Sequence, residues 1–308
     1  MNVLLVILGL LMLVVGSELL VRGGVSIAKR VKISPLIIGL TIVSMGTSTP
    51  ELVVSVKAAL QGYPDMAMGN VLGSNIVNIS FILGLTAVIL AIPVNRETAV
   101  FSWPVLLLAT VLLFGFSCDF KLARWEGIVF VALQVLFIVA LYFRSKRKKQ
   151  QDEEDSGKTY SIVVSILMLI ASIAGLSFGA EFLVKGAVGL ATHMGVDERI
   201  ISLTIVAIGT SMPELITSVV AAMRKQMDIS IGNLIGSNIF NIFTILGVSS
   251  AITPITVNPQ SLYVDMTWAF GLVILLGLCF IPLRNSVVKR WKGLLLVVAY
   301  MAYFFYIF

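Results

Sequence analysis

Two glutamates lie in the middle of long apolar segments, where a charged side chain needs an ionic partner or a function. Glu51 follows GTSTP at 46–50, and Glu214 follows GTSMP at 209–213. A charge in the hydrocarbon region costs about 2.5–3.5 kcal/mol on insertion scales. No lysine or arginine lies within one helical turn of either acid in the sequence. We therefore predict that both carboxylates bind cations.

A proline before each glutamate supplies further oxygen ligands. Pro50 and Pro213 lack an amide donor and push the preceding residue out of helical geometry, so carbonyls near Gly46 and Gly209 lose their hydrogen bonds. Inside a bilayer such carbonyls are tolerated only where they are buried in protein or face a water-filled cavity. Carbonyls, hydroxyls and carboxylates together suit Ca²⁺, which takes about 6–8 oxygen ligands. The alternative is a plain proline kink whose hydroxyls bond back to the helix.

A second motif follows each glutamate, GNVLGSNIVN at 69–78 and GNLIGSNIFN at 232–241. The glycines, four residues apart, allow two helices to approach closely. The polar residues also recur every four residues and share one helix face, so we expect them to contribute oxygens beside the acid-bearing helix. For Asn70 and Asn75 we favour interhelical hydrogen bonds instead. The stripe consists of Asn70, Ser74 and Asn78 in the first copy and Asn233, Ser237 and Asn241 in the second.

These motifs belong to two copies of one longer sequence. Residues 16–94 align with residues 179–257 without a gap, at an offset of 163. Secondary transporters are often built from two repeats that share one site near the middle of the bilayer. The duplication therefore predicts a single site to which both halves contribute, and for which a monomer is sufficient.

The composition is that of a polytopic membrane protein. Of 308 residues, 58% are hydrophobic and 12% charged, and the mean hydropathy is +1.02, whereas soluble domains carry about 25% charged residues. The net charge of +6 resides in short loops between apolar segments, which favours a lipid bilayer and not nucleic acid as the partner. Cys118 and Cys279 form no disulfide or metal-binding pattern, and His193 is the only histidine.

The fold class predicted is an all-α integral membrane protein with ten transmembrane helices, arranged as two inverted five-helix repeats. The first half is 1–143, with its copy of the repeat at about 35–92, and the second half is 160–308, with its copy at about 198–254; the linker is 144–159. The predicted helices are 2–27, 35–60, 66–92, 98–117, 124–143, 160–190, 198–223, 229–254, 262–282 and 290–307.

Lysine and arginine residues determine the predicted topology. Most of them lie in the loops after the first, third, fifth, seventh and ninth helices. The positive-inside rule then places the linker 144–159 in the cytoplasm and both termini outside. Because five is an odd number, the second half enters the membrane in the opposite orientation. Two further acids, Glu18 and Glu181, have a base four residues later, which predicts structural ion pairs with Arg22 and Lys185.

The paired motifs resemble the two alpha-repeats of the calcium/cation antiporter superfamily, and most closely those of prokaryotic sodium/calcium exchangers. The resemblance covers essentially the whole chain. It implies a non-enzymatic antiporter in a prokaryotic plasma membrane, with Ca²⁺ and Na⁺ as transported ions and no cofactor. It also implies four cation positions at the centre of helices 2, 3, 7 and 8, and a sliding motion of the long first and sixth helices. Glycines that would allow this sliding are Gly16, Gly23, Gly24, Gly179, Gly186 and Gly189.

The resemblance assigns the cation ligands residue by residue. The family's acids fall on Glu51 and Glu214. At Ser44 and Ala207 only the backbone carbonyl is carried over, and Thr47 and Thr210 also offer backbone carbonyls to Ca²⁺. The remaining ligand positions are Ser48, Ser74 and Asn78 in the first half and Ser211, Ser237 and Asn241 in the second.

One position departs from the family pattern. Many sodium/calcium exchangers have an aspartate where this chain has Asn241. Two carboxylates balance one Ca²⁺, but three Na⁺ would leave one positive charge in excess. The resemblance implies Ca²⁺/Na⁺ antiport by alternating access, and the two-carboxylate site leaves Ca²⁺/H⁺ antiport as the alternative. A cation channel is less favoured because no filter sequence is visible, and an intramembrane enzyme because the GTS serines lack a histidine or lysine partner.

Overall fold

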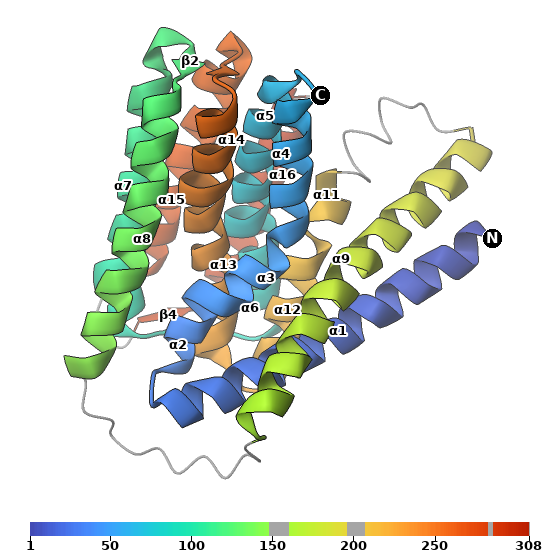
Figure 1. The fold of residues 1–308 in the computed structure, drawn as a ribbon, viewed down its shortest axis with the longest axis vertical. Helices are drawn as coiled ribbons and strands as arrows, with labels where there is room; N and C mark the ends of the chain where they lie inside the picture. The colour runs from blue at the N-terminus through green and yellow to red at the C-terminus, as the bar shows by residue number, and fades with distance from the viewer. Residues whose placement is uncertain (148–159, 196–206, 283–285, 308) are drawn as a thin grey trace. The chain divides into compact units, whose positions relative to one another are not determined.

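The computed structural model describes residues 1–147, 160–195, 207–282 and 286–307, which are almost wholly helical (Figure 1). Within them, eight helical stretches are long and apolar enough to cross a membrane, and nine if the bent pair Pro35–Thr47 and Thr49–Leu60 counts as one span. A membrane-spanning helical fold is thus confirmed. The predicted helix 198–223 lies partly outside the described residues, so the count of ten stays a prediction.

The elements of the first half follow the predicted segments, with two extensions. The first helix runs to residue 31 instead of 27, and the fifth runs to residue 147 instead of 143, so that it continues into the predicted linker 144–159. The elements are α1 (Asn2–Val31), α2 (Pro35–Ile38), the π-helical η1 (Gly39–Val43), α3 (Ser44–Thr47), α4 (Thr49–Leu60), α5 (Pro64–Ile76), the π-helical η2 (Val77–Ile82), α6 (Leu83–Ile89), β1 (Ile92–Val94), the π-helical η3 (Thr98–Ser102), α7 (Trp103–Phe116), the 3₁₀-helical η4 (Ser117–Asp119), β2 (Lys121–Leu122) and α8 (Arg124–Arg147).

The elements of the second half repeat those of the first. Helices α4 and α12 begin and end at positions 163 apart, as do α3 and α11, and α7 and α15. The duplicated sequence therefore folds into duplicated elements. These are α9 (Ile162–His193), α11 (Ala207–Thr210), α12 (Met212–Met223), α13 (Met227–Phe240), the π-helical η6 (Asn241–Leu246), α14 (Gly247–Ile252), β3 (Ile255–Thr256), the π-helical η7 (Ser261–Asp265), α15 (Met266–Cys279), β4 (Ser286–Val288) and α16 (Arg290–Ile307).

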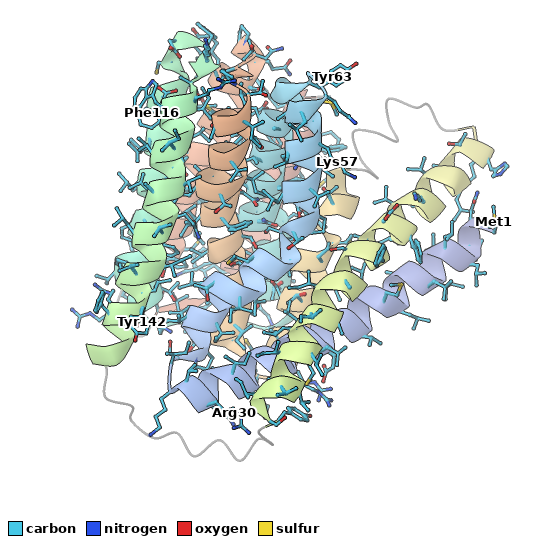
Figure 2. The ribbon with its side chains drawn as sticks, viewed as in Figure 1. Met1, Arg30, Lys57, Tyr63, Phe116 and Tyr142 are labelled. Atoms are coloured by element: carbon cyan, nitrogen blue, oxygen red, sulfur yellow. The ribbon has the colours of Figure 1, made fainter. Side chains whose placement is uncertain are left out.

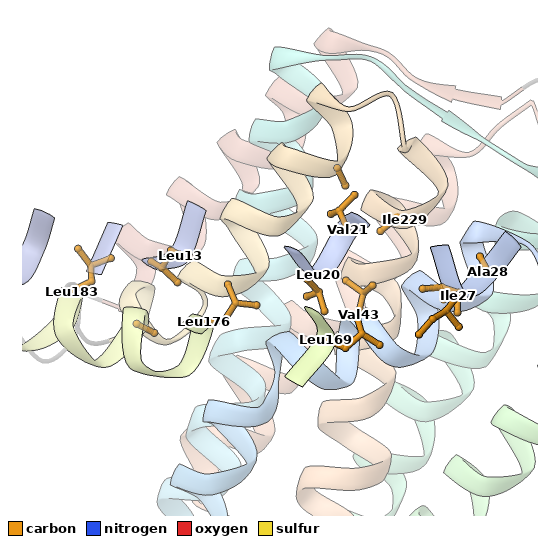
Figure 3. Close-up of a cluster of buried hydrophobic side chains, with 13 residues drawn as sticks. Leu13, Leu20, Val21, Ile27, Ala28, Val43, Leu169, Leu176, Leu183 and Ile229 are labelled. Atoms are coloured by element: carbon orange, nitrogen blue, oxygen red, sulfur yellow. The ribbon is translucent and has the colours of Figure 1, made fainter. Parts of the chain in front are cut away.

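One compact unit consists of residues 1–47 and 135–233 where they are described. Its two long helices, α1 and α9, pack against each other (Figure 1). Glycines allow the close approach, since a Cβ atom on Gly9 would lie 2.7 Å from the carbonyl oxygen of Gly179. Arg30, near the end of α1, donates to the carbonyl of Tyr160 just before α9 (Figure 2). Buried apolar side chains fill the unit, including Leu13, Leu20, Val21, Val43, Leu169, Leu176 and Ile229 (Figure 3).

The glycines predicted to allow sliding mainly bring α1 and α9 together. A Cβ atom on Gly16 would meet Leu176 of α9 at 3.2 Å, and one on Gly186 would meet the carbonyl of Asn2 at 2.7 Å. Only Gly24 faces another element, α2, with its Cβ position 2.9 Å from Ile38. Since close packing binds α1 to α9, these two helices form a pair within the unit.

The other compact unit consists of residues 48–134 and 234–308 where they are described. Close glycine contacts again join its helices, because a Cβ atom on Gly84 of α6 would lie 2.8 Å from the carbonyl oxygen of Gly293 on α16. Phe116 of α7 (Figure 2) stacks against Phe130 of α8, with ring centroids 5.4 Å apart. Two short antiparallel ladders, β1–β4 and β2–β3, connect loops between the helices.

Lys292, at the start of α16, is a buried base that stabilises the end of α15. Its Nζ atom donates to the carbonyl oxygens of Cys279, at 2.6 Å, and Ile281, at 3.0 Å. A positive charge is favourable at the carbonyl end of a helix. We expect Lys292→Met to lower the free energy of unfolding by about 2 kcal/mol, the usual contribution of a charged hydrogen bond. Thermal melting in detergent measures this, with the exposed Lys289→Met as control; equal melting temperatures for both would contradict the role.

Candidate cation-binding site

Glu51 lies just after a break in a membrane helix. Helix α3 ends at Thr47 and α4 begins at Thr49, so the helix is interrupted at Ser48. Pro50 occupies the first turn of α4, where its missing N–H is not needed. The Glu51 side chain is 1% exposed and lies in the same turn, so the helix N-terminus favours its negative charge.

Glu214 repeats this arrangement in the other compact unit. Helix α12 begins at Met212 after α11 ends at Thr210, Pro213 lies in its first turn, and Glu214 is 0% exposed. The hydroxyl of Ser211, at the break, is buried and has no hydrogen-bond partner in the described part of the chain. A plain kink would have bonded this hydroxyl back to the helix, so the break at Ser211 retains an oxygen for a ligand.

The hydroxyls of α3 are used within the protein. Ser44 Oγ donates to the carbonyl oxygen of Thr41 at 3.0 Å. Thr47 Oγ1 lies 3.0 Å from Asn233 Oδ1 and 3.2 Å from the carbonyl oxygen of Ser44. At Ser44 and Thr47 the groups that suit a cation are therefore the backbone carbonyls, which is the form of ligand that the sequence resemblance implies.

Two asparagines of the polar stripe join neighbouring helices. Asn70 Nδ2 donates to Ser55 Oγ at 3.0 Å, linking α5 to α4. Asn233 Nδ2 donates to Ser218 Oγ at 3.1 Å, linking α13 to α12. These are the same bond in the two copies, offset by 163. The interhelical role predicted for Asn70 is confirmed. Ser55 and Ser218 were missed, although both recur one turn after the glutamates in the duplicated sequence.

Asn78 and Asn241 lie in the π-helical turns η2 and η6 and are each 1% exposed. Such turns are rare and frequently occur at functional sites. Both amide atoms of Asn78, and Oδ1 of Asn241, have no hydrogen-bond partner in the described part of the protein. An unpaired buried polar group costs about 1–3 kcal/mol. The cost is recovered if a ligand binds there, as expected for a cation site.

The structure brings the predicted residues together in two sets, one within each compact unit. In the first, α3 and α11 pack against α12; in the second, α4, α5 and η6 pack against one another. Ala207 begins α11, but its side chain lies outside the described atoms. The first set is Ser44, Thr47, Ala207, Thr210, Ser211 and Glu214, and the second is Ser48, Glu51, Ser74, Asn78, Ser237 and Asn241.

The atoms in both sets that could bind a cation are oxygens. Across the residues that the structure describes, no group of three or more histidine, cysteine or acidic side chains could hold a metal. Each set contributes one carboxylate, and its other members are hydroxyls, amides and carbonyls. Hard cations such as Ca²⁺ and Na⁺ fit this chemistry, whereas softer transition metals prefer imidazole or thiolate.

Comparison with known proteins identifies the family. A sequence profile described as "Sodium/calcium exchanger protein" matches residues 1–143 and 164–308. The putative antiporter CaxA of Alkalimonas amylolytica is 38% identical over 98% of this chain and 97% of its own length. The sodium/calcium exchanger MaX1 of Methanosarcina acetivorans is 31% identical, covering 98% of this chain and 97% of its own.

The fold comparison agrees with the sequence comparison. A structure of the sodium-calcium exchanger NCX_Mj, soaked with 10 mM Na⁺ and 10 mM Sr²⁺, superimposes with a TM-score of 0.84 at 31% identity. The match covers 98% of this chain and 96% of that one. Close similarity over both full lengths, in sequence and in structure, means that this chain belongs to the sodium/calcium exchanger family, whose members carry Ca²⁺ and Na⁺ across membranes.

Proposed function

We propose that the chain exchanges Ca²⁺ for Na⁺ by alternating access, with the cations held at mid-bilayer by Glu51, Glu214 and the surrounding oxygens. The observation that carries the proposal is the pair of fully buried glutamates, each at a helix break in a duplicated motif. Family membership supports Ca²⁺ and Na⁺ as the transported ions.

Charge balance explains why such a site exchanges ions. Two ionised carboxylates and one Ca²⁺ are together neutral. Without a cation, two negative charges would cross a region of low dielectric constant, which is very unfavourable. The site therefore holds a cation in both directions of the transport cycle. As a result, Ca²⁺ crosses in one direction only when another cation crosses in the other.

Ca²⁺/H⁺ exchange is the second candidate. The observation that favours it is Asn241, a neutral residue in a buried π-helical turn, which leaves the site with two carboxylates. Two protons would neutralise these carboxylates as completely as one Ca²⁺ does. Proton release on Ca²⁺ binding would then drive the cycle.

The deciding experiment compares two gradients in proteoliposomes. We expect Ca²⁺ uptake into vesicles loaded with Na⁺ and none into vesicles that have only an acidic interior. Vesicles with equal Na⁺ on both sides provide the control. Uptake driven by the proton gradient alone would replace the proposal with Ca²⁺/H⁺ exchange, and Ca²⁺ flux without any counter-gradient would indicate a channel.

The topology proposed is two inverted five-helix halves in a prokaryotic plasma membrane, with both termini outside and the linker 144–159 in the cytoplasm. The loop charges and the repeated element boundaries support this orientation. Labelling tests it: in a Cys118→Ser background, a membrane-impermeant maleimide is expected to modify Ser156→Cys only after the membrane is opened. Modification in intact cells would reverse the orientation.

Helix α1 is tied to α12 by polar bonds between residues that are not repeated in the duplicated sequence. Arg224 Nη2 lies 2.7 Å from Glu18 Oε1, which also pairs with Arg22 as predicted, and Ser17 Oγ lies 2.9 Å from Thr217 Oγ1. At the equivalent positions of the repeat, Arg224 corresponds to Gln61, Thr217 to Val54 and Ser17 to Ala180. In the proposed transport cycle, in which α1 slides, this link would stabilise the position that α1 has in this structure.

We expect Arg224→Gln to raise the exchange rate by about 1.4- to 5-fold. A partly exposed ion pair contributes about 0.2–1 kcal/mol. Without the pair between Glu18 and Arg224, the present position of α1 loses that stabilisation, and the barrier to moving α1 is lower by the same amount. Lys185→Gln is the matched control, because Lys185 pairs with Glu181 of its own helix, as predicted. Initial rates of Na⁺-driven Ca²⁺ uptake give the comparison. Equal rates in Arg224→Gln and wild type would exclude the ion pair as a restraint.

A further inference from the structure

Asn75, near the end of α5, links α5 through its side chain to α13 and to the π-helical turn η6. Its Nδ2 atom donates to the carbonyl oxygen of Asn238 at 3.3 Å. Its Oδ1 atom accepts from Nδ2 of Asn241 at 3.0 Å. All three residues are buried, with exposures of 4% or less. A continuous relay thus runs from a backbone carbonyl to a residue of the candidate cation site.

The direction of this relay is fixed by its first member. A backbone carbonyl can only accept a hydrogen bond, so Asn75 must present its amide nitrogen to Asn238. Its oxygen then faces Asn241, which in turn must present its own nitrogen. The only amide atom of Asn241 left over is Oδ1, which is buried and has no hydrogen-bond partner in the described structure.

The same bond is missing from the other copy of the repeat. Asn78 corresponds to Asn241, and Asn238 corresponds to Asn75, at the offset of 163. The Asn238 side chain donates to the Leu234 carbonyl of its own helix at 2.6 Å. Its Oδ1 and both amide atoms of Asn78 have no hydrogen-bond partner among the described residues. Only one of the two equivalent amides is therefore held in place.

We propose that Asn75 is a positioning residue that makes the neutral Asn241 an oxygen ligand for the transported cation. An amide presents either its oxygen or its nitrogen, and only the oxygen binds a cation. The bond from Asn75 holds the Asn241 amide by its nitrogen, so that its oxygen is available before the cation binds. The entropy cost of ordering this side chain is then not paid on binding. The inference rests on the proposed function, since it requires a cation at this site.

The test measures Ca²⁺ affinity of the purified protein by isothermal titration. Asn75→Leu removes both bonds of the relay at nearly constant volume, and we expect about 10-fold weaker Ca²⁺ binding, the lower end for residues that orient metal ligands. Asn238→Leu is the matched control, because it keeps the backbone carbonyl that anchors the relay. We expect its affinity to stay within about 2-fold of wild type.

A double-mutant cycle separates positioning from general damage. In an Asn241→Ala background there is no amide to orient, so adding Asn75→Leu is expected to cause no further loss of affinity. In exchange assays, Asn75→Leu is expected to raise the KM for Ca²⁺ with little change in maximal rate. Equal affinities for Asn75→Leu and wild type, or equal losses in both backgrounds, would overturn the inference alone. Absence of Ca²⁺ binding by the wild type would overturn the proposed function, and the inference with it.

Discussion

Glu214→Gln is expected to reduce Ca²⁺ exchange by at least about 100-fold, and Glu51→Gln to do the same. Both carboxylates are buried, at 0% and 1% exposure, so no water compensates for a missing charge. With one carboxylate left, a bound Ca²⁺ carries an excess positive charge. At roughly 4 Å and an effective dielectric constant of about 20, one charge interaction amounts to about 4 kcal/mol. That loss exceeds the roughly 2.7 kcal/mol which corresponds to 100-fold.

Each variant needs a control that removes a buried glutamate charge outside the candidate cation site. Glu126→Gln provides it, because Glu126 is also a buried glutamate, 6% exposed, but its Oε2 atom accepts from the backbone N–H of Ala123 at 2.7 Å. A glutamine oxygen can accept the same bond, so we expect near wild-type exchange. The measurement is Na⁺-driven Ca²⁺ uptake at matched protein content in the vesicles. Exchange above one tenth of wild type in Glu214→Gln would mean that Glu214 is not a Ca²⁺ ligand.

The helix breaks could be predicted because their causes are local in sequence. Pro50 and Pro213 dictate where α4 and α12 restart, and each brings its glutamate into the first turn. The duplicated sequence also predicts the duplicated elements, since equal local sequence produces equal helices. The ion pairs Glu18–Arg22 and Glu181–Lys185 were predictable for the same reason, being one helical turn apart.

The partners of side chains on other helices could not be predicted. The interhelical hydrogen bonds predicted for Asn70 and Asn75 are confirmed, but their partners, such as Ser55 for Asn70, were not predicted. Partners depend on tertiary packing, which residue type and spacing along the chain do not reveal. Arg224 was missed likewise, because its partner Glu18 lies in a distant helix.

Asn241→Asp is expected to make Na⁺ binding strongly dependent on pH. In the proposed function, with two glutamates at one site, the variant adds a third carboxylate, and three Na⁺ would then balance three negative charges. We expect the Na⁺ concentration that half-inhibits Ca²⁺ binding to fall at least about 10-fold between pH 6 and pH 9, because one added charge nearby is worth more than the 1.4 kcal/mol of a tenfold change. In the wild type, where residue 241 carries no proton that titrates, we expect little change.

The relay through Asn75 determines how the variant behaves at each end of this range. A protonated aspartic acid can donate its O–H to Asn75 Oδ1, as the Asn241 amide does in the wild type. An ionised aspartate cannot donate, and it would place a carboxylate oxygen against Asn75 Oδ1. If Asn75 turned over to donate, its oxygen would face the Asn238 carbonyl instead. The variant is therefore expected to resemble the wild type at pH 6 and to diverge from it as the pH rises.

The Asn78→Asp variant distinguishes the effect of the added charge from the effect of breaking the relay. It places an equal charge at the corresponding position of the other repeat, where the amide has no hydrogen-bond partner in the described structure. Both variants are expected to gain pH-dependent Na⁺ competition, because both add a carboxylate. Ionisation should also strengthen Ca²⁺ binding in the absence of Na⁺, but less in Asn241→Asp than in Asn78→Asp, since only at residue 241 does it break a hydrogen bond. Ca²⁺ titrations at pH 6 and pH 9 decide this, and equal gains in Ca²⁺ affinity in the two variants would show that the relay does not hold residue 241.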